Sequence, residues 1–329
     1  MKRKNVLSLL LPCLVAGNVY ANEPATPISS ATPSKEIRAF HNLEVGVTAG
    51  TTGIGIDFST PINSYLQVRG GFSMMPKFTL SMDFDLNTTS PGNTGEEGTE
   101  SQFSGIINTL ESMTGTKITD QVSMLCEPTL YNFKALVDVF PFKNKKWHLT
   151  AGIYAGSSTI GRACNATEAM PALFAANTFN TIYEKAANYD PIVEIGDFFL
   201  YLDDDLTEKV LNYGRMGMEL GERVSDGTIY KMEPNEYSMV TAEIKTNSVK
   251  PYLGFGYGSN AISSNNTYNV SFDCGVLFWG GAPNIILHDG TDLTTDVTNI
   301  KGQMGNYVNL AKRFKAFPVI SISVSRRLF

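Results

Sequence analysis

The chain has 329 residues, of which 43% are hydrophobic, and it carries 26 Lys and Arg against 32 Asp and Glu. Its formal net charge of −6 argues against nucleic acid as a partner, because phosphate backbones bind basic surfaces. Beyond the N-terminus no stretch approaches the roughly 18 consecutive apolar residues of a membrane-spanning helix, so the sequence predicts no such helix.

The N-terminus has the pattern of a secretory signal peptide. Three bases at positions 2–4 precede an apolar run of about ten residues, and cleavage is expected after Ala21. Lipidation at Cys13 is the weaker alternative, because Pro12 is a poor fit to the small residue that such a site needs. Removing the peptide, residues 1–21, takes away three bases and no acids, which leaves 23 bases against 32 acids and a net charge of −9. The mature chain is therefore expected to be exported, either soluble or crossing a membrane as strands.

Residues 22–41 are rich in Pro, Ser, Thr and Ala without an apolar period, which is typical of a flexible leader. After this leader, apolar and polar residues alternate with period two in eight stretches, as strands with one apolar face do. The stretches cover about 43–49, 54–59, 66–84, 131–139, 148–155, 250–257, 269–278 and 318–329.

The connections between these stretches are unequal. Those after the second, fourth and sixth are brief, whereas those after the third, fifth and seventh are long and cover about 87–127, 160–247 and 283–316. Short turns at one end and long loops at the other are typical of bacterial outer-membrane barrels with both termini in the periplasm. A soluble sandwich, the alternative, would not require this asymmetry. The sequence therefore predicts an all-β fold: an eight-stranded antiparallel transmembrane β-barrel over 42–329, with short helices in long extracellular loops.

Four segments of the chain carry a family resemblance. They are "VKPYLGFGYGSNAIS", "NVSFDCGVLFWGGAP", "ALVDVFPFKNKKWHLTAGIYAG" and the final "FPVISISVSRRLF". They resemble the small outer-membrane β-barrel proteins of Bacteroidota, in the broad OmpA/OmpW-like eight-strand class. The resemblance implies residence in the bacterial outer membrane as a multi-pass barrel, in contact with lipid and lipopolysaccharide. It is specific for architecture and implies little about activity, and the long loops take no part in it.

The last stretch contains a candidate assembly signal. The resemblance implies that a terminal aromatic on the lipid-facing positions is read by the barrel-assembly machinery. Phe329 is one position out of phase, so either Leu328 takes the terminal place or a bulge resets the register. Arg326 is then expected to reach toward the periplasmic headgroups. The candidate signal comprises Ile320, Ile322, Val324, Leu328 and Phe329.

The inward-facing positions of the predicted strands collect charged residues. They comprise Glu44, Asp57, Arg69, Lys134, Asp138, His148, Lys250 and Asp273. The interior of an eight-stranded barrel is just wide enough for its own side chains, so each charge must find an opposite charge or a hydrogen-bond partner. Four acids and three bases are close to balance, which favours an ionic network that closes the lumen. A proton or ion path along the same groups is the functional alternative.

The sequence gives little sign of catalysis or metal binding. Some eight-stranded barrels act on lipid A with a Ser/His/acid set, but neither His41, His148 nor His288 has a serine or acid at a recognisable spacing. The acidic run at 203–205 lacks the spacing of a calcium loop. We therefore expect no enzyme, no cofactor and no metal.

The long loops contain helical patterns and an excess of acid. Apolar residues recur at helical spacing in "FSGIINTLESM", "PALFAANTFNTIYEKAANY", "DDDLTEKVLNYG" and "TTDVTNIKGQMGNYVNLAKRF", which predicts an ordered cap of short helices. Residues 162–245 hold 15 acids and 7 bases. A solvated face is the preferred interpretation of this charge, with a cation or cationic-ligand site as the alternative.

Three cysteines remain in the mature chain. Cys126 precedes the fourth stretch and Cys164 follows the fifth, so both are expected at the same rim of the barrel, where they are a candidate disulfide. Cys274 falls on the lipid-facing positions, where it acts as a small apolar residue. None of the three lies in a CxxC or a His/Cys cluster.

The predicted role is structural, or a surface interaction through the extracellular loops with an unknown extracellular partner. A narrow transport conduit for a small solute is the first alternative, and a lipid-modifying enzyme is the second.

Overall fold

The computed structural model describes residues 42–85, 121–260, 262, 267–300 and 302–328. The predicted signal peptide and leader, His41, the helical pattern at 103–113 and Phe329 lie outside these residues.

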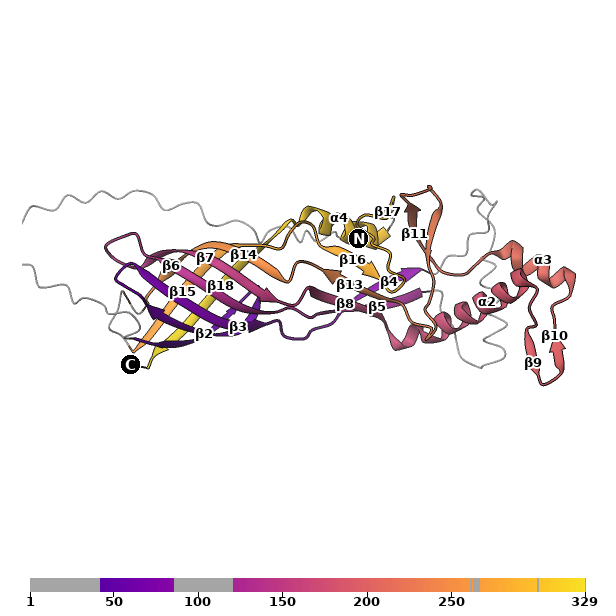
Figure 1. Ribbon diagram of the computed structural model, residues 1–329, viewed down its shortest axis with the longest axis horizontal. Coiled ribbons are helices and arrows are strands. Elements are labelled where there is room, and N and C mark those ends of the chain that lie inside the picture. Colours follow the sequence, from indigo (N-terminus) through magenta and orange to yellow (C-terminus); the bar gives the residue numbers. More distant parts are fainter. Residues whose placement is uncertain (1–41, 86–120, 261, 263–266, 301, 329) are drawn as a thin grey trace, which may run out of the picture. The chain divides into compact units, whose positions relative to one another are not determined.

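Eight strands close into an antiparallel barrel, which confirms the predicted fold class (Figure 1). In order around the barrel they are β1 (Glu44–Gly50), β18 (Ala316–Arg327), β15 (Tyr268–Phe278), β14 (Val249–Gly258), β7 (Trp147–Gly156), β6 (Tyr131–Val139), β3 (Leu66–Met74) and β2 (Gly53–Pro61). Each of the eight predicted stretches supplies one of these strands. The turns β2–β3, β6–β7 and β14–β15 lie at one end, which we call the turn end, and the opposite end is the loop end.

Alternation along the strands gives the barrel two chemically different faces. In β2, Asp57 is buried whereas its neighbour Ile56 is 52% exposed. The register of β1 with β18 places Val47 opposite Val324, and both side chains are exposed on the outer surface. Because directly paired residues share a face, apolar side chains gather outside and polar side chains inside.

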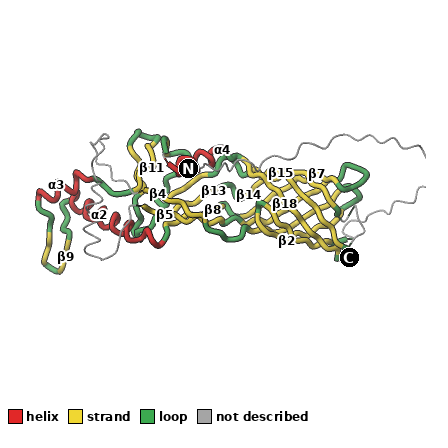
Figure 2. Tube along the Cα trace, turned by 180° about the vertical axis from the view of Figure 1, so that it is seen from behind, coloured by secondary structure: helices red, strands yellow, loops and turns green. Residues whose placement is uncertain are grey.

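Five neighbouring barrel strands continue into a second sheet. Strands β3, β6, β7, β14 and β15 lead into or out of β4 (Leu80–Asp85), β5 (Gln121–Pro128), β8 (Thr159–Asn165), β13 (Thr241–Lys245) and β16 (Asn284–Leu287), which pair in the same order. Figure 2 shows this sheet as a continuation of the barrel strands. The predicted stretch at 66–84 is therefore wrong as a single barrel strand. It is interrupted at Pro76, which has no N–H for a strand ladder.

The remaining loop-end elements are helices and small sheets. The helices are η1 (Thr167–Ala169), α2 (Met170–Asn188), α3 (Asp204–Tyr213) and α4 (Gly302–Arg313). The short strands are β9 (Val193–Ile195), β10 (Phe198–Leu200), β11 (Met218–Arg223), β12 (Ile229–Met232) and β17 (Val297–Thr298). α2, α3 and α4 lie in three of the segments where helical spacing predicted helices, which confirms those predictions. Among the described residues, no helix is both long enough and apolar enough to span a bilayer.

Local signals fix the ends of these helices. α2 has Pro171 in its first turn, where a missing N–H costs nothing. In α3, the Asp203 carboxylate accepts a hydrogen bond from the Leu206 N–H at 2.7 Å, and Gly214 ends the helix with φ 71°.

The loop-end elements share one apolar core. A single buried cluster joins Met124 of β5, Leu173 of α2, Tyr230 of β12, Leu287 of β16 and Val308 of α4. The prediction of helices in long loops was therefore incomplete, since these segments fold with the extended sheet around a core of their own.

Candidate functional site

All eight charged residues expected in the lumen lie on inward-facing positions and are buried. They are Glu44, Asp57, Arg69, Lys134, Asp138, His148, Lys250 and Asp273. Alternation along each strand puts them inside, because their sequence neighbours occupy the exposed outer face. The structure brings six of them together in the middle of the barrel in two groups, one around Arg69 and one formed by Lys134 and Asp57. Glu44 and Lys250 lie apart from these.

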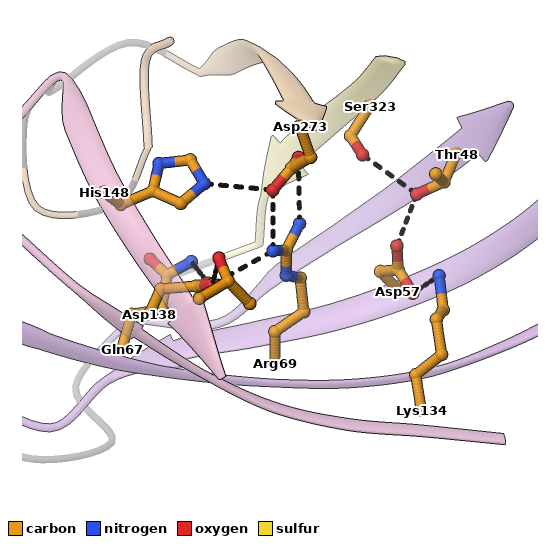
Figure 3. A network of polar contacts seen from close by, with 10 residues as sticks. Thr48, Asp57, Gln67, Arg69, Lys134, Asp138, His148, Asp273 and Ser323 are labelled. Carbon is orange, nitrogen blue, oxygen red and sulfur yellow. Dashed lines mark hydrogen bonds and ion pairs between the residues drawn. The ribbon is translucent and has the colours of Figure 1, made fainter. Parts of the chain in front are cut away.

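Arg69 is the centre of the network (Figure 3). Its Nη2 lies 2.9 Å from Asp273 Oδ1 and 3.0 Å from Asp138 Oδ1, and its Nη1 donates to Asp273 Oδ2 at 3.2 Å. The guanidinium thus forms a forked pair with Asp273 and a further bond with Asp138, the arrangement for which its planar donors are suited.

Other side chains also bond to the carboxylates of Asp138 and Asp273. His148 Nε2 lies 3.0 Å from Asp273 Oδ1, and Thr150 Oγ1 donates to Asp138 Oδ1 at 2.7 Å. Gln67 Nε2 approaches Asp138 Oδ2 at 3.4 Å. Each buried carboxylate therefore has several partners, which offsets its cost of desolvation.

A second ion pair lies beside the first. Lys134 Nζ is 2.5 Å from Asp57 Oδ1, and the Thr48 hydroxyl donates to the other oxygen of Asp57. Thr48 also shares a hydrogen bond of 2.9 Å with the hydroxyl of Ser323. This second chain of contacts runs from β6 across β2 and β1 to β18.

Glu44 and Lys250 have separate partners. Glu44 accepts from Asn269 Nδ2 at 2.5 Å and from Ser325 Oγ at 3.2 Å, with Arg327 Nη2 at 3.9 Å. Sequence reasoning overlooked Arg327 because its strand was interpreted as a terminal signal, although it shares the inward parity of Ser325.

Lys250, which is fully buried, donates to Ser157 O at 2.9 Å and to Asn132 Oδ1 at 3.3 Å. It lies at the loop end of β14, whereas Glu44 begins β1 at the turn end. The lumen therefore holds polar contacts at both ends as well as in the middle.

An apolar layer also fills the lumen, and sequence reasoning did not identify it. Leu136, Tyr154, Tyr252, Leu277 and Val319 form a buried cluster. The Tyr154 and Tyr252 rings lie 5.4 Å apart between centroids. The inward parity of both tyrosines was a usable signal, because two bulky rings facing a narrow lumen must fill it.

Inward-facing glycines make room for these large side chains. A Cβ on Gly256 would lie 2.3 Å from His148 Nε2, and one on Gly254 would lie 2.4 Å from the Tyr252 hydroxyl. A Cβ on Gly71 would meet the Asp57 carboxylate. The glycines opposite bulky or charged partners are thus part of the packing of the lumen.

A small polar cavity remains near the turn end. It measures about 40 Å³ and is lined by Glu44, Asp57 and Arg69 together with serine residues of β2, β15 and β18. This volume is enough for very few water molecules.

The predicted disulfide between Cys126 and Cys164 is wrong. Both thiols are free. The two cysteines do lie on paired strands, but Cys126 is opposite Ala163 and Cys164 is opposite Leu125. Because adjacent residues of a strand point to opposite faces, the two side chains lie on opposite faces of the extended sheet. The register was off by one residue, which the sequence alone did not reveal.

The structure also shows where the remaining predicted residues lie. Ile320, Ile322, Val324 and Leu328 of the candidate assembly signal are exposed on the outer face. Cys274 shares that face with exposed neighbours two residues away on either side. His288 donates its backbone N–H to Thr241 O at 3.0 Å beside the loop-end sheet. Within the described part of the chain, no group of His, Cys, Asp and Glu could hold a metal ion.

Comparisons with known proteins give distant likenesses. No protein-family model and no curated protein matches this chain. Crystal structures of Acinetobacter baumannii CarO2 and CarO are similar, with TM-scores of 0.36 and 0.35 and identities of 13% and 12%. The alignments cover 89% and 87% of this chain and 100% and 96% of those chains. Likenesses this loose say nothing about what the chain binds or does.

Proposed function

We propose that the chain is a bacterial outer-membrane barrel with a closed lumen and a surface-interaction role carried by its loop-end structure. The bond between Arg69 and Asp273 carries the first part of the proposal, because it joins strands on opposite sides of the barrel through the centre of the lumen. The apolar layer around Tyr154 and Tyr252 adds a second closure.

The outer surface of the barrel supports insertion in a bilayer. Outward-facing side chains such as Phe133, Leu149 and Ile322 are large, apolar and exposed. In water such a continuous apolar band would cost free energy, whereas in a bilayer it contacts hydrocarbon.

Aromatic residues at the turn end support the same placement. Trp147 and Tyr257 pack on the outer face with ring centroids 4.9 Å apart and ring planes tilted by 57°, and Lys145 Nζ lies 3.2 Å from the centroid of the Tyr65 ring. Arg326 lies over the Tyr268 ring. Aromatic rings with neighbouring bases are enriched where a membrane protein meets lipid headgroups. The proposal places this end in the periplasm and the loop end outside. The proposed partners are membrane lipid, lipopolysaccharide around the loop end, and the assembly machinery.

The β9–β10 hairpin supports the surface-interaction role. Its apolar side chains are exposed: Val193, Ile195, Phe198, Phe199 and Leu200. Contiguous exposed apolar residues mark interaction sites in the water-exposed parts of proteins. The proposal includes no reaction.

Single-channel recording tests the closed lumen. Purified protein in planar bilayers should give no stable conductance, after insertion in the same lipid has been verified by the heat-dependent gel shift of folded barrels. Steady ohmic steps would contradict closure and favour a conduit.

The surface role is tested separately on expressing cells. A triple substitution, Phe198→Ser with Phe199→Ser and Leu200→Ser, should reduce cell–cell or cell–surface adhesion while the protein remains in the outer membrane. A matched triple serine substitution at exposed residues of α3, Leu206, Lys209 and Asn212, is the control. Equal adhesion in the wild type and the hairpin variant would refute the role.

A further inference from the structure

A large apolar cavity lies at the loop end, outside the lumen. It measures about 490 Å³. One wall is the face of the extended sheet that carries Met124, Cys126 and Ala242, and the opposite wall is α4 with Tyr307 and Ala311. Figures 1 and 2 both draw α4 alongside the strands of this sheet. The volume is in the range of small-molecule sites in proteins.

The chemistry of the wall is that of a hydrocarbon site. Its lining contains no charged residue, and Ser81 is its one short hydroxyl. The indole N–H of Trp279, which also lines the cavity, already donates to Phe314 O at 2.9 Å. Leu80 and Leu310 of the lining are 57% and 50% exposed, so the cavity opens to the surroundings and is unlike a sealed core. Covering this wall with a hydrocarbon chain removes apolar surface from water, and the hydroxyls of Ser81 and Tyr307 are the few polar groups that it offers to a sugar or a peptide.

Basic residues occupy the end of α4 and a position just after it, next in sequence to residues that line this cavity. Lys312, Arg313 and Lys315 lie next in sequence to the lining residues Ala311 and Phe314, at the end of α4. All three are exposed, and none of them makes an ion pair with another described residue. An apolar cavity beside exposed bases fits a ligand with a hydrocarbon chain and an anionic head.

We propose that this cavity binds a free long-chain fatty acid, with the chain between α4 and the sheet and the carboxylate near Lys312 and Lys315. A single-chain ligand is of the size that a cavity of about 490 Å³ accepts, whereas lipids with two or more chains are considerably larger. The inference goes beyond the proposed role and does not depend on a closed lumen, because the cavity wall shares none of the charged lumen residues.

The tryptophans allow a direct test. The chain has two, Trp147 and Trp279, and only Trp279 lines the cavity. Full-length mature protein carrying Trp147→Phe, held in amphipol, is titrated with 9,10-dibromostearic acid, a short-range quencher of tryptophan fluorescence. We expect saturable quenching at one equivalent per chain, reversed by unlabelled stearate. Quenching that rises linearly without saturation would show partition into the amphipol and overturn the proposal.

A cavity-filling variant and its control locate the ligand. Ala311→Phe places a ring inside the cavity and should weaken binding by about tenfold, the lower range of overpacking effects. Asn309→Phe, on an exposed position of the same helix, should leave binding unchanged. Equal affinity in Ala311→Phe and the parent would refute the site. If Ala311→Phe does not fold, Leu310→Asp at the half-exposed rim provides the same test.

Competitors identify the head group and the source of the chain. Stearate should compete, whereas stearylamine should compete poorly, and the double variant Lys312→Glu with Lys315→Glu should lose this preference. Equal competition by acid and amine would overturn the carboxylate assignment. Native mass spectrometry should show a fatty acid that stearate exchanges. A stoichiometric phospholipid that stearate does not displace would overturn the free fatty acid as the occupant.

Discussion

Arg69 and Asp273 face each other across the full width of the barrel. β3 and β15 are four strands apart in either direction around the closed sheet, and yet Arg69 Nη2 lies 2.9 Å from Asp273 Oδ1. The pair therefore links opposite walls that share no backbone hydrogen bond. It contributes to the barrel in two ways, because it fixes the shape of the cross-section and occupies the centre of the lumen.

Removing Arg69 should destabilise the barrel strongly. Arg69→Ala leaves Asp138 and Asp273 buried without their shared cation, and breaking a buried pair in this way costs about 3–5 kcal/mol. Unfolding by urea in lipid vesicles, followed by tryptophan fluorescence, measures the change in the free energy of unfolding. The control is Arg162→Ala, which removes an exposed ion pair with Glu243 and should cost about 0–1 kcal/mol. Equal effects of the two substitutions would contradict the transluminal bond.

Two adjacent glycines of β3 should differ sharply in their tolerance of a methyl group. A Cβ on Gly71 points inward against the Asp57 carboxylate, whereas the nearest atom to one on Gly70 is Lys134 O at 3.8 Å. We expect Gly71→Ala to cost about 1–3 kcal/mol by overpacking. Gly70→Ala should be neutral or slightly stabilising, since it restricts the unfolded chain. The same urea titration compares them, and a cost for Gly70→Ala as large as for Gly71→Ala would argue against the inward packing.

The cysteines test the register of the extended sheet. Alkylation of the denatured, unreduced mature chain should find three free thiols. Leu125→Cys puts a second thiol directly opposite Cys164 and should form a cross-strand disulfide under oxidation, whereas native Cys126 should not. A bridge between Cys126 and Cys164 in the wild type would contradict the observed register.

Alkylation of Cys126 in the folded protein should be slow at neutral pH and accelerate as pH rises. The pKa of this thiol is raised mainly by burial and, to a smaller extent, by the negative charge of the Glu127 carboxylate. Less of it is therefore the reactive thiolate at a given pH than in the denatured chain. Rates measured by mass spectrometry from pH 7 to 10 check this, and Glu127→Gln should shift the profile to lower pH. Equal rates in folded and denatured protein would contradict the burial.

Asn180 should stabilise the loop-end core without affecting the barrel. Its side chain donates to Met216 O at 2.8 Å and accepts from the Met216 N–H at 2.7 Å, so it satisfies both backbone groups in a buried place. Asn180→Ala should cost about 1–3 kcal/mol locally. Hydrogen exchange should increase in α2 and β11 and stay unchanged in β1 and β18, whereas Asn188→Ala at the exposed end of α2 should change neither. Increased exchange throughout the barrel strands would show that Asn180 also stabilises the barrel, which would contradict the prediction.

The barrel was predictable because its signal is local. Alternation along each strand is independent of its neighbours, so Ile320, Ile322 and Val324 identify an outer face before any pairing is known. The same parity predicts that Arg69 and Asp273 point inward. It does not say which charges meet, because that depends on the stagger of strands four positions apart around the barrel.

The extended sheet was not predictable in the same way. Pairing of β5 with β8 decides that Cys126 lies opposite Ala163, and a shift of one residue would have brought it opposite Cys164. The segments at 160–247 mix helices with strands as short as β9, whose alternation is too brief to be recognised. Their shared core, from Met124 to Val308, joins residues far apart in sequence, and composition does not specify such contacts.

Oxygen and nickel accessibility along β18 tests most directly whether this barrel spans a bilayer. In a cysteine-free background, single cysteines at positions 319–324 carry a nitroxide label in protein reconstituted in lipid vesicles. Labels at Ile320, Ile322 and Val324 should collide with oxygen and be protected from a water-soluble nickel complex, whereas labels at Val319, Ser321 and Ser323 should be inaccessible to both. Free access of the nickel complex to all six positions would contradict a lipid-facing strand that covers a closed lumen.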